Sequence, residues 1–266
     1  MAKASKSYRW IKLERDGGVA ILTLNDPATL NAIQPAMMRE IEDALRRIDD
    51  DDLARAIVIT GAGRGFCSGQ NLRSVDDIKG GLGVVRNAMR EYFPVFRAIR
   101  RARAPVIAAV NGVAAGGGFS LALAADFIVA ARSALFIQVF SRIGLIPDVG
   151  SSFFLPRLIG RARALGVMMT NQPITADKAK EWGIIWDCVD DERMMNEAMA
   201  LARKLAAGPT QTYALTRKVV DESHHHDLER QFEYELEIQS HILETADARE
   251  GITAFLEKRP AKFQGA

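Results

Sequence analysis

Apolar residues along the chain follow two periods, one typical of strands and one typical of helices. Short apolar, β-branched runs predict strands at residues 19–24, 54–63, 105–112, 127–131 and 134–139. Helical spacing follows the first run, at Met37, Met38, Ile41, Leu45 and Ile48. A second helical pattern covers residues 81–105 and is interrupted or bent near Pro94, and a third begins directly after the glycines at 116–118.

Alternating strands and helices predict an α/β protein built in layers. From about Thr175 the pattern becomes helical, and we expect a core over residues 1–204 followed by a helical region over residues 205–266. The amphipathic surface of this last region suits packing on a partner subunit as well as packing on its own domain. The pattern leaves both arrangements open.

The composition is that of a globular protein, with 266 residues of which 48% are hydrophobic and 26% charged. A net charge of only +2 makes no case for binding nucleic acid or an anionic membrane. The two cysteines, Cys67 and Cys188, show neither a disulfide framework nor a metal spacing, which favours a cytoplasmic location. We see no secretory signal and no apolar run of the roughly 18–20 residues that span a bilayer.

Two glycine-rich turns follow predicted strands, at residues 60–72 and 111–126. Exposed backbone N–H groups at such turns stabilise a negative oxygen, and two turns together can offer two N–H groups to one oxyanion. Tight turning alone explains either stretch equally well.

Other catalytic motifs fit poorly. The spacing of G-x-G-x-x-G is not met, and neither a Walker sequence nor a G-x-S-x-G elbow occurs. The run His224 to His226 is interpreted as a solvated face rather than a metal site, and Cys67 as a small apolar filler. We expect no metal and no cofactor.

One acid interrupts an apolar stretch over residues 142–160. Asp148 follows Pro147 and has Ile143, Leu145 and Ile146 nearby in sequence. It is either an ordinary turn acid or an acid on the floor of an apolar pocket, where the charged form is disfavoured as a general base requires.

Several motifs in order, "GAGRGFCSGQNL", "PVIAAVNGVAAGGGFSLALAAD", "IGLIPDVGSSFFLPRLIG" and "REGITAFLEKRPAKF", resemble the enoyl-CoA hydratase/isomerase (crotonase) family over nearly the whole chain. Within it, "FIQVFSRIGLIPDVG", "GRARALGV" and "EWGIIWDCVDDE" most resemble the ring 1,2-epoxyphenylacetyl-CoA isomerases of aerobic phenylacetate breakdown. The resemblance implies a spiral of repeated ββα units with a C-terminal helical trimerisation region. It also implies a homotrimer or a dimer of trimers.

The resemblance further implies an acyl-CoA substrate, so coenzyme A enters as part of the substrate. The thioester oxygen would lie between the backbone N–H groups of Gln70 and Gly117. The remaining residues implied for substrate and CoA binding are Leu30, Asn31, Ala32, Ser68, Gly69, Gly116, Phe140, Phe255 and Lys258. Of these, Phe255 and Lys258 match a region that approaches the CoA of a neighbouring subunit.

The chain departs from the family at two positions. Hydratases carry glutamates where this sequence has Ser120 and Phe140, and neither residue replaces a pair of carboxylates. Asp148 matches the aspartate of family members that are not hydratases. We therefore expect an isomerase in which Asp148 shuttles a proton, acting on the ring epoxide, on a 3-enoyl-CoA, or on both. Hydration or thioester hydrolysis within the same family, and non-catalytic CoA binding, are the alternatives.

The acyl group itself is open. Phe119, Phe140, Phe153 and Phe154 favour an aromatic or bulky chain, although at least two of these rings are better interpreted as core.

Overall fold

The computed structural model describes residues 7–50, 54–72 and 81–266. Its backbone repeats a unit of two strands and a helical segment. In the three middle units the first strand joins a six-stranded sheet and the second joins a four-stranded sheet, whereas both strands of the first unit lie in the six-stranded sheet. This repetition is the ββα spiral that the family resemblance implies, and the α/β class predicted from periodicity is confirmed.

The larger sheet has the order β1-β2-β3-β5-β7-β10. Its strands are β1 (Ile11–Asp16), β2 (Val19–Leu24), β3 (Ala56–Gly61), β5 (Val106–Val110), β7 (Phe127–Ala131) and β10 (Asp187–Val189). β1 and β2 pair antiparallel, and each later pair is parallel. Every residue of β3 and β5 is buried, which explains why these strands read as unbroken apolar runs.

The strands of the smaller sheet lie in the segments that follow strands of the larger sheet. It consists of β4 (Gly65–Cys67), β6 (Val113–Ala115), β8 (Leu135–Ile137) and β9 (Ile174–Thr175), in that order. β4 and β6 lie inside the two glycine-rich turns, so each turn leads from one sheet into the other. Cys67 pairs with Ala114 across β4 and β6, and this parallel pairing holds the two turns side by side.

The helical patterns are confirmed in outline. Helix α1 (Pro35–Asp49) buries the predicted stripe, Met37, Met38, Ile41, Leu45 and Ile48. The second pattern consists of α2 (Gly81–Asn87), a π-helical turn (Ala88–Tyr92) and α3 (Phe93–Arg101). The expected interruption is this π-helical turn, which ends directly before α3. Pro94 lies in the first turn of α3, where it is tolerated because the backbone N–H groups of a first turn have no acceptor within the helix.

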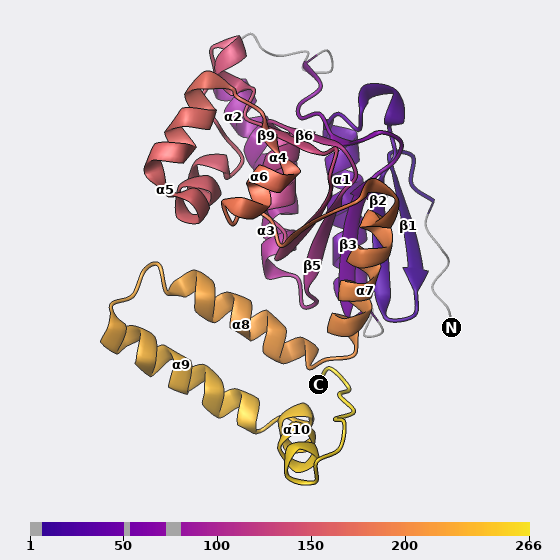
Figure 1. Cartoon of the computed structure of the whole chain (residues 1–266), viewed down its shortest axis with the longest axis vertical. Helices are drawn as coiled ribbons and strands as arrows, with labels where there is room; N and C mark the ends of the chain where they lie inside the picture. The colour runs from indigo at the N-terminus through magenta and orange to yellow at the C-terminus, as the bar shows by residue number, and fades with distance from the viewer. Residues whose placement is uncertain (1–6, 51–53, 73–80) are drawn as a thin grey trace.

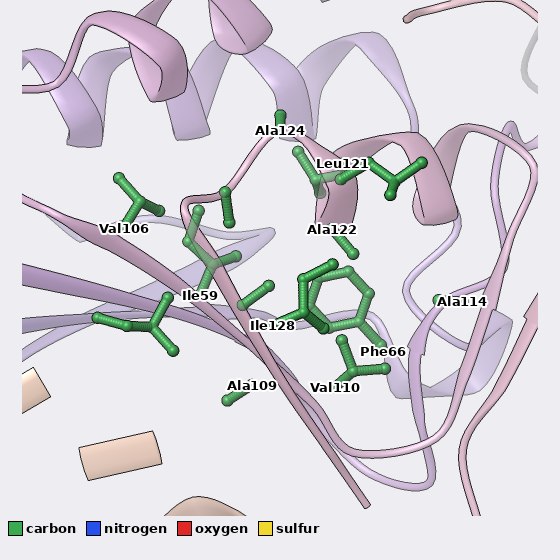
Figure 2. Packing of buried hydrophobic residues seen from close by; sticks show 14 of the residues in the cluster. Ile59, Phe66, Val106, Ala109, Val110, Ala114, Leu121, Ala122, Ala124 and Ile128 are labelled. Atoms are coloured by element: carbon green, nitrogen blue, oxygen red, sulfur yellow. The ribbon is translucent and has the colours of Figure 1, made fainter. Parts of the chain in front are cut away.

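Helix α4 (Gly117–Leu123) is buried along its whole length. Figure 2 shows its Leu121 and Ala122 in the same apolar cluster as Ile59 of β3 and Phe66 of β4. The start of α4 is therefore held by the core on several sides, which fixes the position of its first backbone N–H groups.

The C-terminal half contains six helices: α5 (Ser151–Thr170), α6 (Ala176–Glu181), α7 (Met194–Ala206), α8 (Thr210–Glu222), α9 (Leu228–Leu243) and α10 (Ala246–Leu256). α7 packs on β2, β3, β5 and β7 of the larger sheet. α8 and α9 form a pair to one side of the ββα body, with α10 at its end (Figure 1). The division at residues 204 and 205 falls in the last turn of α7 and stays a prediction.

Helix α8 is tied to the body by Arg217. Its guanidinium forms an ion pair with Asp126 and donates to the carbonyls of Ala102, at 2.6 Å, and Ala104, at 3.0 Å. The side chains of Arg217 and Asp126 are only 9% and 15% exposed. Asp126 also accepts a hydrogen bond from Val106 N, so one buried network joins α8 to the edge of β5.

Large apolar side chains remain exposed on α9 and α10 in the single chain. They are Leu228, Phe232, Leu236, Leu243, Ile252, Phe255 and Leu256. Among the described residues, no helix combines the length and the apolar character needed to cross a membrane.

Candidate active site

The two glycine-rich turns meet at Gly69 and Gly117. A Cβ atom added to Gly69 would lie 3.5 Å from Gly117 N and 2.7 Å from Ala115 O. The two backbones therefore pack directly against each other. Gly69 also has φ of +92°, a conformation that favours glycine. The backbones of the two turns therefore approach each other closely, as donation of two N–H groups to one oxyanion requires.

Gly117 N is part of this contact, and Gln70 follows Gly69 directly in the chain. Ile33 pairs with Gln70 by donating to Gly69 O at 2.7 Å and accepting from Asn71 N at 2.9 Å. Neither bond uses Gln70 N. Gly117 is the first residue of α4, so its N–H has no acceptor within the helix. In the described part of the chain, neither Gln70 N nor Gly117 N has a recorded backbone acceptor.

Hydrogen bonds from Ser68 and Gly116 hold the two turns in place. The Ser68 hydroxyl donates to Thr29 O at 2.8 Å, and Ser68 N donates to Leu30 O at 2.9 Å. Gly116 N donates to Ile137 O at 2.8 Å, and the ring of Phe140 comes within 4 Å of the Cβ position of Gly116. Phe140 therefore lies beside the second turn and is buried.

The segment at Leu30, Asn31 and Ala32 lies against the first turn. Leu30 and Asn31 both have positive φ, of 55° and 57°. The Asn31 side chain is fully buried, donates to Ala62 O and Gly65 O, and accepts from Asp26 N. Its side chain therefore supports the segment from inside, and CoA contact along this segment stays a prediction.

Asp148 lies in a strained turn at the start of α5. Val149 has φ of +42°, which is rare for a β-branched residue, and Gly150 has φ of +95°. The turn closes with Ser151 N donating to Asp148 O at 3.1 Å. Val149 Cγ2 lies 3.7 Å from the Cβ position of Gly117, so the turn abuts the start of α4. Strain of this kind concentrates at functional sites.

The carboxyl group of Asp148 is both accessible and perturbed. Its side chain is exposed in the single chain, as are Ile143, Leu145 and Ile146. Partial burial nevertheless raises the pKa of Asp148, and its own backbone N–H opposes this in part. In the single chain Asp148 is a turn acid with a raised pKa, rather than an acid on the floor of an enclosed pocket.

Ser120 stands behind this turn. It is fully buried, its hydroxyl lies 2.6 Å from the Ser151 hydroxyl, and it donates to Asp148 O at 3.4 Å. Gln138 donates to Ser151 Oγ at 3.0 Å, and no described residue pairs with Gln138 Oε1. This network joins α4, the segment after β8 and the Asp148 turn. Sequence reasoning missed it, although buried small polar residues within apolar runs were the available signal.

The four phenylalanines of the sequence analysis separate in the structure. Phe119 packs against Phe136 in the core, with tilted rings whose centroids are 5.0 Å apart. Phe153 and Phe154 pair with each other on α5, and Arg157 lies over Phe153. Phe140 lies against Gly116.

Phe255 and Lys258 do not join the other site residues. Both are exposed at the end of α10, which Figure 1 shows at the opposite end of the molecule from α4. A single chain therefore does not bring them to Asp148, and their contact with CoA remains a prediction. Within the described residues, no group of three or more His, Cys, Asp or Glu side chains is arranged to hold a metal ion.

Known proteins of one family are similar to this chain over nearly its whole length. The family model described as enoyl-CoA hydratase/isomerase matches residues 14–266. The chain is 43% identical to "1,2-epoxyphenylacetyl-CoA isomerase" of Escherichia coli, over 93% of this chain and 95% of that protein. It is 44% identical to "Probable enoyl-CoA hydratase" of Rhodobacter capsulatus, over 97% and 99% of the two chains.

Solved structures agree as well. The crystal structure of an enoyl-CoA hydratase from Bacillus anthracis superposes with a TM-score of 0.91 at 29% identity, covering 97% of this chain and 100% of that one.

Proposed function

Because the chain belongs to the enoyl-CoA hydratase/isomerase family, we propose that it is an acyl-CoA isomerase in which Asp148 moves a proton. The proposal is carried by one observation: two backbone N–H groups without a recorded acceptor, those of Gln70 and Gly117, belong to turns that lie next to the turn of Asp148, whose pKa is raised. Gly69, which precedes Gln70, packs on Gly117 N, and the Asp148 turn abuts Gly117 through Val149.

The chemistry follows from these groups. The thioester oxygen accepts hydrogen bonds from Gln70 N and Gly117 N, which stabilise the enolate formed when C2 loses a proton. Asp148 takes that proton and, for a 3-enoyl-CoA, returns it to C4, so the double bond moves to C2 and C3. One base suffices because only the position of a proton changes. For a ring epoxide, the same carboxylate assists the rearrangement to the seven-membered oxepin.

The environment of Ser120 supports isomerisation over hydration. Addition of water requires one group to activate the water and one to deliver a proton. Ser120 is fully buried and hydrogen-bonded to Ser151, while Phe140 offers an apolar ring. The name of the Escherichia coli relative supports an aromatic ring epoxide as substrate.

Hydration is the second candidate, because a relative of similar identity carries a hydratase name. Hydration of crotonyl-CoA by this chain would therefore contradict the assignment of Asp148 as the sole acid–base group. Asp148 is accessible to water, so it could also activate water for thioester hydrolysis. Release of free CoA, even if slow, would indicate that activity.

The test compares Asp148→Asn with the wild-type protein on 3-hexenoyl-CoA and on the ring epoxide. Asn keeps the size of the side chain and removes the base, so isomerisation is expected to fall by about 10²–10⁴-fold. Calorimetric binding of a non-reacting acyl-CoA is expected to stay within about twofold, because the Gln70 and Gly117 N–H groups are unchanged.

The matched control is Asp16→Asn. Asp16 is exposed at the β1–β2 hairpin and forms a surface ion pair with Arg203, so its loss has little effect. Full isomerisation by Asp148→Asn would remove Asp148 from the mechanism. Retained acyl-CoA binding without turnover by the wild-type protein would favour a non-catalytic CoA-binding role.

Assembly into a homotrimer, or a dimer of trimers, in the cytoplasm is part of the same proposal. Exposed apolar residues on α9 and α10 support it, because monomers rarely expose large contiguous apolar patches. The expected result is a sedimentation mass of three or six chains.

A further inference from the structure

A buried tyrosine lies beside the proposed oxyanion hole, and the mechanism above does not use it. Tyr92 is 6% exposed, and its hydroxyl is buried without a hydrogen-bond partner among the described residues. Buried tyrosine hydroxyls ordinarily have a partner, because an unpaired polar group is costly inside a protein. The missing partner indicates a group that arrives with a ligand.

The backbone around Tyr92 is held firmly. Tyr92 ends the π-helical turn Ala88–Tyr92, a feature that often marks functional positions in helices. The preceding residue, Glu91, is 4% exposed and is held by Arg39 of α1, at 2.8 Å, and by Arg90, at 2.8 Å. The turn is therefore anchored to α1 through its neighbour, and Tyr92 has a fixed direction.

The groups that act on the Tyr92 hydroxyl belong to the proposed site. The Gln70 side chain is the polar group that approaches the Tyr92 hydroxyl, without forming a hydrogen bond of normal geometry. The Asp148 carboxylate lies within electrostatic reach of the same hydroxyl. Gln70 carries one of the proposed oxyanion donors and Asp148 is the proposed base, so the hydroxyl lies near two groups of the proposed site.

We propose that the Tyr92 hydroxyl donates a hydrogen bond to an oxygen atom on the acyl group of the bound CoA thioester. Tyr92 thereby makes the site prefer an oxygen-bearing acyl group, such as a ring epoxide, over a plain enoyl chain. A donor that is left unpaired when the substrate lacks the oxygen discriminates against that substrate. This inference rests on the proposed function and names the acyl class that the same site prefers.

The protonation state of Tyr92 is consistent with a donor. Burial is the main cause that raises the pKa of Tyr92, and the carboxylates of Glu91 and Asp148 add to it. The hydroxyl therefore keeps its proton at neutral pH.

The kinetic test uses Tyr92→Phe, which removes the hydroxyl and keeps the ring. For the ring epoxide, kcat/KM is expected to fall about tenfold, the effect of one hydrogen bond to a substrate oxygen. For 3-hexenoyl-CoA, kcat/KM is expected to change less than about threefold. Tyr8→Phe is the matched control, because it removes a hydroxyl that donates to Asp43 at 2.7 Å, and it should leave the ratio of the two values unchanged.

A binding test is independent of turnover. Phenylacetyl-CoA and 2-hydroxyphenylacetyl-CoA differ by one ring oxygen, and calorimetry gives the ratio of their dissociation constants. The wild-type protein and Tyr8→Phe are expected to bind the hydroxylated thioester more tightly, and Tyr92→Phe to bind both equally.

Thermal unfolding of the free protein completes the test. Because the hydroxyl has no described partner, Tyr92→Phe is expected to be at least as stable as the wild-type protein. A lowered melting temperature would indicate a structural partner and overturn the inference, as would equal losses of kcat/KM on both substrates or an unchanged binding ratio. Absence of isomerisation by the wild-type protein would contradict the proposed function, whereas the binding ratio would still decide the role of Tyr92.

Discussion

Replacing Gly118 with alanine is expected to damage the proposed oxyanion hole without touching the substrate. Gly118 is the second residue of α4, and a Cβ there would lie 2.2 Å from Cys67 O and 2.7 Å from Cys67 C. Both atoms belong to the backbone of β4, so no side-chain rotation relieves the contact.

The size of the effect follows from these distances. Ordinary contacts of a Cβ begin at 3.4 Å, so α4 and β4 must separate by roughly 1 Å. α4 carries Gly117 N and β4 leads to Gln70 N, so the separation widens the hole. Effective loss of one donor lowers kcat by about 10²–10³-fold. The overpacking itself is expected to lower the free energy of unfolding by about 1–3 kcal/mol.

The control is the same substitution in α5. A Cβ on Gly166 meets nothing within 4 Å, and the residue is exposed in a helix, so Gly166→Ala is expected to stabilise the protein by about 0.5–1 kcal/mol. Isomerisation of 3-hexenoyl-CoA and thermal unfolding are measured for both variants. Wild-type kcat in Gly118→Ala would refute the view that contact between α4 and β4 sets the spacing of the two donors.

Three further predictions concern the acid, the helical region and the thiols. Only the ionised carboxylate of Asp148 accepts a proton, and its pKa is raised. In a pH–rate profile, kcat/KM is therefore expected to fall with decreasing pH at a midpoint above about 3.9, the ordinary aspartate pKa. A midpoint at or below that value would contradict the partial burial of Asp148. Arg217→Ala leaves the Asp126 carboxylate buried without its ion-pair partner, so urea unfolding should show a loss of about 3–5 kcal/mol in the free energy of unfolding. An unchanged midpoint would mean that α8 is held by other contacts. Burial raises the pKa of Cys67 to about 12 and also raises the pKa of Cys188. An aromatic disulfide reagent at pH 8 should therefore label both thiols only after denaturation. Rapid labelling of the native protein would show that these thiols are exposed.

Strongly periodic segments were predictable from the sequence. Helix α1 and the buried strands β3 and β5 owe their positions to apolar spacing that local sequence already contains. β1 was missed because it is a polar edge strand, "IKLERD", whose residues are mostly solvent-accessible. β4 and β6 were hidden inside glycine-rich turns, since three-residue strands form only where a partner strand is supplied by distant sequence.

The candidate site divides in the same way. The two turns were singled out because glycine at a turn has a local meaning, and Asp148 because an acid contrasts with apolar neighbours, whereas the choice of Gln70 and Gly117 as donors came from the family resemblance. The exposure of Asp148 was not predictable, since it depends on how the turn at Val149 abuts α4. Tyr92 was missed because an aromatic residue in an amphipathic pattern indicates core, and its unpaired hydroxyl is visible only in three dimensions.

The pairing of Cys67 with Ala114 has a consequence for the order in which the protein folds. It closes a long loop of chain, as does the bridge between Ile33 and Gln70, and contacts between distant residues form late during folding. Helices such as α1 and α7 form from neighbouring residues within microseconds. After dilution from denaturant, enzymatic activity should therefore return more slowly than helical circular dichroism, and its return marks the closing of the last long-range strand pairs.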